Sequence, residues 1–388
     1  MTRPTVAIAH DYLTQRGGAE RVVLSMLEAF PDATIHTTLY DPEGTYPEFR
    51  DARIVTSPLD RVGALRRHHR AALPLFAPVA SRVRVDADVT VVSSSGWAHG
   101  FDLRGRSLVY CYSPARWLYQ ADDYLGSPAH RSMAGVGLAV LRRPLVRWDR
   151  RAALRADRYL AISRVVQQRI RSTYGLDSEV VSAPHSMDAA APREVVPELA
   201  EWTDGYHLVV SRLLPYKHVD KVVDAFAGRA DRLVIVGRGP EEQRLRSRLG
   251  PTMRLLSGLT DAQMRWVYAH CTRLLAPSIE DFGLTPLEAA TFGKPTVALR
   301  AGGYLDTIVE GRTGVFFDRS EPDAIRAALA EADRLAWSAD DLRAQAARFT
   351  VAPFAARLQA EVAELVERGG RDSTDPPFGP GPGDRLGP

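Results

Sequence analysis

Short apolar runs alternate with longer stretches of helical periodicity along most of this chain. This alternation is typical of β-α-β units, in which helices cover the faces of a parallel sheet. Strands are expected at 6–10, 34–40, 89–95, 107–112 and 158–163, and in a second series at 206–211, 232–237, 273–278 and 295–300. The predicted fold class is therefore α/β, with two Rossmann-like domains facing each other across a cleft. In such sheets, ligands bind outside the carboxyl ends of the strands.

The length of 388 residues also favours two domains, because single cores rarely grow beyond about 250–300 residues. We expect the first domain at 1–190 and the second at 200–348. A helix at 349–368 is expected to pack back on the first domain. The segment 369–388 lacks apolar residues to bury and is predicted to be a disordered tail.

The cysteines and the apolar runs indicate a cytoplasmic protein. Cys111 and Cys271 are far apart in sequence, so they form no disulfide framework or metal-ligand cluster. The N-terminus has no signal-peptide core. The longest apolar runs, 71–80 and 133–141, are much shorter than the ~20 residues of a membrane-spanning helix.

The first half of the chain carries a basic excess. Between Arg61 and Arg171, 20 Lys and Arg residues stand against 7 Asp and Glu. Such a surface can contact an anionic membrane or a phosphorylated acceptor; a solvated arginine-rich surface is the alternative. No nucleic-acid-binding motif accompanies the charge, so we expect no nucleic-acid partner. The basic clusters are Arg66, Arg67, His68, His69 and Arg70, and then Arg142, Arg143, Arg147, Arg150 and Arg151.

Two carboxylates, Glu280 and Glu288, lie across a loop and the start of a helix that follow the expected strand at 273–278. Carboxylates can accept hydrogen bonds from sugar hydroxyls, and backbone N–H groups at a helix start can bind phosphate. Another interpretation is purely structural. Thr285-Pro286-Leu287-Glu288 has the residue types of a capping box, with Thr285 as N-cap.

Two cations, Arg212 and Lys217, follow the strand at 206–211. At the carboxyl end of a strand they can neutralise a diphosphate, and they would act most strongly on the charge that develops as a glycosidic bond breaks. Two solvated surface cations are the alternative.

Taken together, these motifs resemble glycosyltransferase family 4. The resemblance rests on GGAERV at 17, SRLLPYK at 211, VGRGPE at 236, the pair of glutamates at 280 and 288, and AGGYLDTIVEGRTGVFF at 301. It extends to about residue 368, in the family's order. The segments 93–100, 110–119 and 215–220 are most similar to bacterial mannosyltransferases of surface-polysaccharide and glycolipid assembly.

This resemblance implies a GT-B fold, a retaining reaction and no essential metal or other cofactor. It implies that 1–190 binds the acceptor and 200–348 the donor. Arg212 and Lys217 would bind the donor diphosphate, Glu280 the transferred hexose and Glu288 the ribose. The remaining donor contacts would come from Gly17, Gly18, Gly237, Phe282, Gly283 and Leu284.

The chain departs from the family pattern at Tyr112, where the family commonly has a histidine that supports the reacting sugar. Tyrosine is not a base near neutral pH, so we expect no proton transfer there. His99 could replace that histidine or be a solvent-facing loop residue. Together with Arg116, Tyr112 and His99 are assigned to the acceptor or sugar side. Asp86-Ala87-Asp88 matches a metal-binding D-x-D but precedes its strand, and is set aside.

The function predicted from these features is transfer of a hexose from a nucleotide-diphosphate sugar, with GDP-mannose favoured, to a glycolipid or polyprenyl-linked saccharide. One alternative is another GT-B sugar-nucleotide enzyme, such as a UDP-glucose-type transferase or an epimerase. Another is a non-catalytic partner subunit of the same fold.

Overall fold

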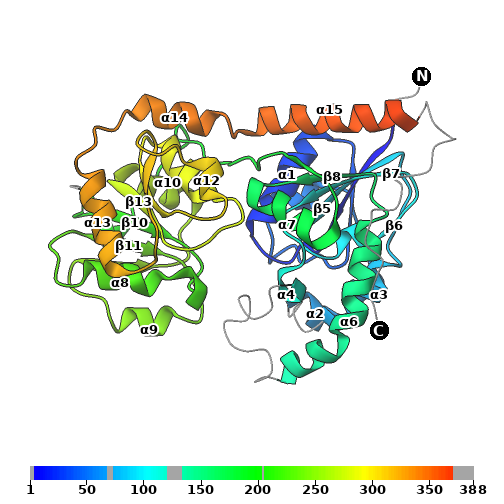
Figure 1. The fold of residues 1–388 in the computed structure, drawn as a ribbon, viewed down its shortest axis with the longest axis horizontal. Coiled ribbons are helices and arrows are strands. Elements are labelled where there is room, and N and C mark those ends of the chain that lie inside the picture. Colours follow the sequence, from blue (N-terminus) through cyan, green and yellow to red (C-terminus); the bar gives the residue numbers. More distant parts are fainter. Residues whose placement is uncertain (1–3, 68–72, 120–132, 203–204, 370–388) are drawn as a thin grey trace, which may run out of the picture.

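A computed structural model describes residues 4–67, 73–119, 133–202 and 205–369 of the chain. Within these residues, parallel strands form one large sheet in each half of the chain, and helices pack around both (Figure 1). This arrangement confirms the predicted α/β fold with two Rossmann-like units.

The first sheet has the strand order β3-β2-β1-β5-β7-β8-β9. Its order reverses between β1 and β5, which creates a topological switch point where ligands commonly bind. A separate parallel pair is formed by β4 (Arg84–Val85) and β6 (Asp102–Leu103). The strands of the large sheet are β1 (Val6–His10), β2 (Thr34–Thr37), β3 (Ile54–Thr56), β5 (Val89–Ser94), β7 (Arg106–Cys111), β8 (Arg158–Ala161) and β9 (Glu179–Val180).

The second sheet has the order β12-β11-β10-β13-β14-β15, so its switch point lies between β10 and β13. The sequence pattern had not indicated the edge strands of the two large sheets, β3, β9, β12 and β15, which lie away from the switch points. The strands are β10 (His207–Val210), β11 (Leu233–Val236), β12 (Met253–Leu256), β13 (Arg273–Ala276), β14 (Thr296–Leu299) and β15 (Gly314–Phe317).

The helices follow the strands as crossover connections. Those of the first half are α1 (Gly18–Ala29), α2 (Gly63–Arg67), α3 (Leu73–Ala80), α4 (Arg116–Tyr119), α6 (Met133–Ala153) and α7 (Arg164–Tyr174). Those of the second half are α8 (Val219–Phe226), α9 (Glu242–Arg246), α10 (Asp261–His270), α11 (Leu284–Thr291), α12 (Tyr304–Thr307), α13 (Pro322–Ala332), α14 (Ala339–Ala347) and α15 (Val351–Gly369).

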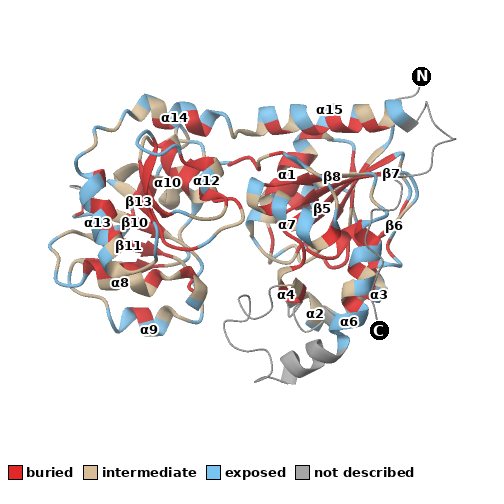
Figure 2. Ribbon diagram, viewed as in Figure 1, coloured by how far each residue is buried: buried red, intermediate tan, exposed pale blue. Residues whose placement is uncertain are grey.

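The central strands are buried because helices cover both faces of each sheet (Figure 2). Every residue of β5, with sequence VTVVSS, is buried. Continuous burial of this kind favours β-branched residues over an alternating pattern. Helix α7 buries one stripe, and its ends are well defined: Ser163 accepts a hydrogen bond from the Val166 N–H, and Gly175 closes the helix in the left-handed conformation.

The last helix, α15, packs against the first half of the chain although it follows the second half (Figure 1). Phe354, Leu358, Val362 and Leu365 belong to the core that contains β1 and β5. The chain therefore crosses between the two halves twice. The tail beyond Gly369 lies outside the described residues. So do His68, His69 and Arg70 of the first basic cluster.

Membrane-spanning helices were searched for among the described residues. None is both long and apolar enough to cross a bilayer.

Candidate functional site

Lys217 and Glu280 meet where β10 and β13 end at the switch point of the second sheet. Lys217 ends a short turn, Pro215–Lys217, and its Nζ forms an ion pair with Glu280 Oε1. The Ser278 hydroxyl donates to the same carboxylate oxygen at 2.9 Å. Burial lowers the pKa of Lys217, and the Glu280 carboxylate opposes that shift. The structure thus brings together two of the predicted site residues, 63 positions apart.

Arg212 lies beside this pair but is exposed. Its Nη2 donates to the Tyr216 hydroxyl at 3.2 Å, and its charge acts on Lys217. Two cations therefore lie at the carboxyl end of β10, one buried and one accessible. Such a pair can attract a diphosphate.

Helix α11 begins at Leu284, and its N-cap is Gly283, with φ of 94°. The tight approach of Tyr304, whose Cδ1 would lie 2.5 Å from a Cβ at residue 283, favours glycine there. The predicted capping box is wrong, because Thr285 lies inside the helix and no side chain caps it. The buried Phe282 anchors the preceding loop.

Glu288 faces α10 instead of the helix start. Its Oε2 accepts a hydrogen bond from the Tyr268 hydroxyl at 2.6 Å. Burial raises the pKa of Glu288, and the charge of Arg21 in the first half opposes that shift. Arg21 also lies 3.8 Å from Asp261, the first residue of α10. Glu288 is therefore close to the boundary between the two halves.

Gly18, at the start of α1, lies against the start of α11. A Cβ on Gly18 would lie 3.6 Å from Leu284 Cδ1, so the glycine turn of the first half faces the 280–284 loop of the second. Gly17 has even less room, because a Cβ there would lie 2.4 Å from Glu20 Oε2. Burial raises the pKa of Glu20 to about 7.

Asp281 links the 280–284 loop to the first half, which sequence reasoning did not foresee. Arg116 Nη2 donates to its Oδ1 at 2.6 Å, and Arg169 binds the same oxygen. The Ser163 hydroxyl donates to the Asp281 carbonyl oxygen. The one feature of the sequence that could have indicated a role for Asp281 is its position next to Glu280. Arg169 belongs to no motif, so nothing in the sequence indicated its contact with Asp281. Arg116, predicted on the sugar side, thus contacts the residue beside Glu280.

A second link between the halves involves Asp306. The Arg164 N–H donates to Asp306 Oδ2 at 2.8 Å, and the Arg164 guanidinium pairs with Oδ1. Asp306 therefore accepts from the first N–H of α7 and pairs with the side chain of the same residue.

Tyr112 contacts the backbone next to the glycine turn. Its hydroxyl donates to the Ala19 carbonyl at 3.2 Å and lies 2.9 Å from Ser93 Oγ, which in turn lies 2.9 Å from His10 Nδ1. Burial raises the pKa of Tyr112. A buried, bonded hydroxyl with a raised pKa does not act as a base, in agreement with the sequence argument.

His99 is buried, so the interpretation as a solvent-facing loop residue is wrong. Its Nε2 lies 3.0 Å from Asp149 Oδ1, and its Nδ1 lies 3.1 Å from Ser94 Oγ. Its ring packs near Trp148 and Tyr174 in the first half. These contacts hold α6 and α7 against the sheet and give His99 no contact with the Lys217–Glu280 pair.

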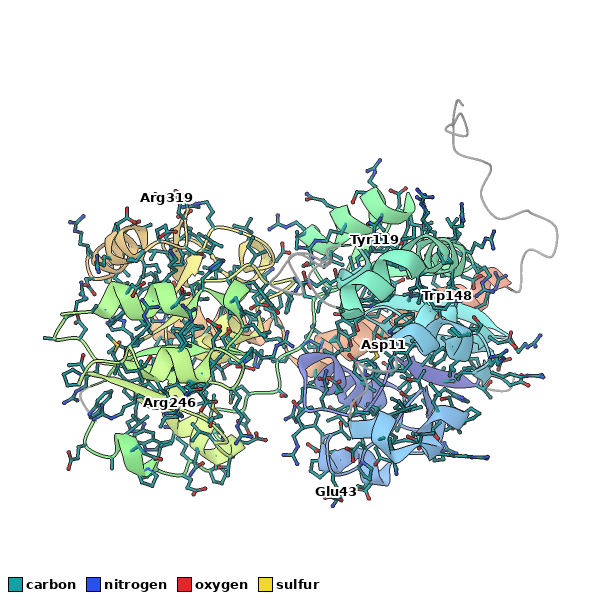
Figure 3. All side chains as sticks on the ribbon, turned by 90° about the horizontal axis from the view of Figure 1, so that it is seen from below. Asp11, Glu43, Tyr119, Trp148, Arg246 and Arg319 are labelled. Carbon is teal, nitrogen blue, oxygen red and sulfur yellow. The ribbon has the colours of Figure 1, made fainter. Side chains whose placement is uncertain are left out.

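Asp11, which directly follows β1 and is labelled in Figure 3, organises the loop after β5. Its carboxylate accepts from the N–H groups of Ser95, Trp97 and Ala98 at 2.6–2.8 Å, and also from the Ser95 hydroxyl. Four donors satisfy this buried carboxylate, so it shapes the first switch point.

Asp86 and Asp88 lie at the opposite end of the sheet from the strands' carboxyl ends. Asp88 accepts from the Thr5 N–H and hydroxyl at 2.8 Å, which ties the start of β5 to the start of β1. Across the described part of the chain, no group of three or more His, Cys, Asp or Glu residues is arranged to hold a metal ion.

Two family models match the chain. The model described as Glycosyltransferase Family 4 matches residues 16–190, and the one described as Glycosyl transferases group 1 matches residues 196–348. A GDP-mannose-dependent alpha-mannosyltransferase of Mycolicibacterium smegmatis is 30% identical over 67% of this chain and 72% of that protein. The chain belongs to glycosyltransferase family 4. It is accordingly a glycosyltransferase that acts on nucleotide sugars.

Two further likenesses place this glycosyltransferase among GT-B proteins. A glycogen synthase of Pseudomonas fluorescens is 34% identical over 41% of this chain, but the chain matches only 35% of that protein's length. The structure of Anabaena HepE in complex with UDP and glucose aligns over 93% of this chain and all of its own, with a TM-score of 0.66 and 18% identity. At that identity the likeness concerns the fold alone.

Proposed function

We propose that this glycosyltransferase is a retaining enzyme that moves mannose from GDP-mannose to a glycolipid or polyprenyl-linked saccharide. The observation that carries the proposal is the meeting of Lys217 and Glu280 at the switch point, beside Arg212. The glycine turn at Gly17 and Gly18 faces the adjoining loop. The two cations, the Glu280 carboxylate and the glycine turn thus lie close to the place where the two halves meet.

In the proposed reaction, Arg212 and Lys217 bind the donor diphosphate. Lys217 exchanges part of its ion pair with Glu280 for a phosphate oxygen, which frees a carboxylate oxygen for a hydroxyl of the transferred hexose. Backbone N–H groups of Phe282, Gly283 and Leu284 lie at the start of α11, where a helix favours an anion. The two cations stabilise the charge that builds on the leaving diphosphate and require no metal.

The ribose is assigned to Glu288. Its Oε2 is oriented by Tyr268, as an oriented acceptor for a ribose hydroxyl should be. Gly237 allows the loop after β11 to approach: a Cβ there would lie 1.9 Å from the Ser211 carbonyl oxygen. This close packing sets the loop after β11 directly against the end of β10.

GDP-mannose is favoured as donor because the relative named for it matches 72% of its own length. A UDP-hexose or ADP-hexose is the second candidate. It is kept as a candidate because a glycogen synthase is also similar to 41% of this chain.

Contact with an anionic membrane is proposed for the first half. On α6, Arg143, Arg147, Arg150 and Arg151 are exposed, and no carboxylate of the described residues pairs with them. Leu154, one residue past that helix, is 58% exposed. Binding to vesicles of anionic lipid should therefore weaken steeply with salt. Binding that salt leaves unchanged would contradict this part of the proposal.

The function is tested by incubating the purified protein with GDP-mannose, UDP-glucose or ADP-glucose and a membrane extract, and measuring nucleoside diphosphate release and the labelled product. We expect GDP release, lost in Glu280→Ala and Lys217→Ala and retained in Arg319→Ala, whose arginine pairs with Asp323 on the surface. Full turnover by either site variant would overturn the site. Absence of transfer with every donor would favour the partner-subunit alternative.

A further inference from the structure

Arg238 occupies a tightly held position in the loop after β11. The Leu213 N–H donates to its carbonyl oxygen at 2.8 Å, and the neighbouring Gly237 N–H donates to the Leu256 carbonyl at 3.0 Å. A Cβ on Gly239 would lie 2.2 Å from the Leu213 carbonyl oxygen. The backbone of Arg238 is thus pinned between the ends of β10 and β12, so the origin of its side chain is well defined.

The Arg238 side chain reaches across the strand ends to Gly258. Its Nη2 lies 2.5 Å from the point that a Cβ on Gly258 would occupy, and Gly258 has φ of 75°. Any side chain at residue 258 would displace the guanidinium. The guanidinium is therefore spread over the carboxyl ends of β11 and β12.

No carboxylate among the described residues pairs with Arg238, which is exposed. The nearest acids in sequence are engaged elsewhere: Glu241 pairs with Arg244, and Glu242 accepts from Arg246 at 2.9 Å. An exposed guanidinium without a counterion among the described residues, on a loop whose backbone is held at the ligand-binding edge of a sheet, is suited to a ligand with paired acceptors.

The ribose end of the proposed donor site is connected to the loop of Gly258 through α10. Glu288 accepts a hydrogen bond from Tyr268 of α10 at 2.6 Å, and α10 begins at Asp261, three residues after Gly258. The diphosphate is assigned to the ends of β10 and β13. A nucleoside that extends from there past Glu288 has its base on the β11–β12 side, where Arg238 lies.

We infer that Arg238 selects guanine in the donor, with its two-pronged guanidinium donating to O6 and N7 of the base. This inference rests on the proposed GDP-sugar donor. Guanine presents two adjacent acceptors on that edge, whereas adenine presents one acceptor and one amino donor, and uracil has no N7. A guanidinium can donate to both acceptors of guanine, whereas the amino group of adenine is itself a donor and repels it.

The test is calorimetric titration of the full-length protein with GDP, UDP and ADP. Wild type should prefer GDP. Arg238→Ala should lose roughly tenfold or more in GDP affinity while UDP and ADP change little, since a bidentate guanine contact gives that degree of discrimination. Arg238→Lys keeps the charge without the fork and should also lose the preference. Arg319→Ala, in the same half but elsewhere on its surface (Figure 3), is the matched control.

The outcomes separate the inference from the donor assignment. If wild type prefers GDP and both Arg238 variants keep that ratio, the inference fails and the donor assignment stands. An equal loss for all three nucleotides would make Arg238 a phosphate ligand and also overturns the inference. If wild type binds UDP or ADP at least as tightly as GDP, both fail together.

Discussion

Removal of the Asp281 carboxylate should loosen the contact between the two halves of the enzyme. Its Oδ1 binds both Arg116 and Arg169, and all three side chains are 19–22% exposed. Exposed ion pairs contribute about 0–1 kcal/mol, and breaking a buried one costs about 3–5 kcal/mol. At this intermediate burial, and with the contacts of Ser163 and Arg164 still in place, we expect Asp281→Ala to cost about 1–2 kcal/mol.

That cost should fall on the arrangement of the halves, because most core residues of each half pack within that half, and Phe282 and Leu287 are the buried residues of the second sheet's half that join the first core. A loss of 1–2 kcal/mol lowers the ratio of molecules in which the halves make these contacts to molecules in which they do not about 5- to 30-fold. We expect kcat/KM to fall by up to that factor and small-angle X-ray scattering to show a larger radius of gyration. The matched control is Asp323→Ala, which removes an exposed pair inside the second half.

Unchanged scattering together with unchanged kcat/KM in Asp281→Ala would refute the reasoning. So would an equal effect of Asp323→Ala.

Three further outcomes are expected. Tyr112→Phe removes the hydrogen bond to the Ala19 carbonyl; it should cost about 1 kcal/mol in urea unfolding and raise the donor KM, and an unchanged KM would contradict a role in positioning the glycine turn. Burial raises the pKa of Glu20 to about 7, so the stability that the protonated carboxyl contributes is present at low pH and is lost as pH rises from about 4.5 to 7. The free energy of unfolding of Glu20→Gln, relative to that of wild type, should therefore be higher at pH 8 than at pH 5, by up to about 3 kcal/mol. A difference that is the same at both pH values would contradict this prediction. Leu358→Ala should lower the free energy of unfolding by about 2–5 kcal/mol and lower the melting temperature, because this fully buried side chain joins α15 to the first core. A decrease below 1 kcal/mol would show that α15 is only loosely attached.

Much of the fold was predictable because the signals are local. Apolar runs such as VAIAH at Val6–His10 and LVIV at Leu233–Val236 specify buried parallel strands whatever surrounds them. The switch point between β10 and β13 then follows from the usual order of such sheets, and it brings Lys217 and Glu280 together. The positions of charged residues at the predicted strand ends were enough to predict that part of the site.

Local patterns were misleading where two structures suit the same residues. Thr285-Pro286-Leu287-Glu288 satisfies the rules of a capping box, yet the helix starts earlier because Gly283 can adopt a positive φ against Tyr304. Glu288 is then turned toward Tyr268, twenty residues away in sequence. His99 has no apolar periodicity around it to indicate burial, and its environment depends on Asp149 of a distant helix.

The sequence by itself determined the two α/β units, the strand ends that bear the charged residues and the family to which the enzyme belongs. Only the tertiary structure decided which charges meet: Asp281 with Arg116 and Arg169, 165 and 112 positions away, and Arg238 with Gly258. The physical reason is that hydrophobic periodicity and backbone preferences act within a few residues. The pairing of charges instead depends on how whole sheets and helices are oriented, and no short stretch of sequence encodes that orientation.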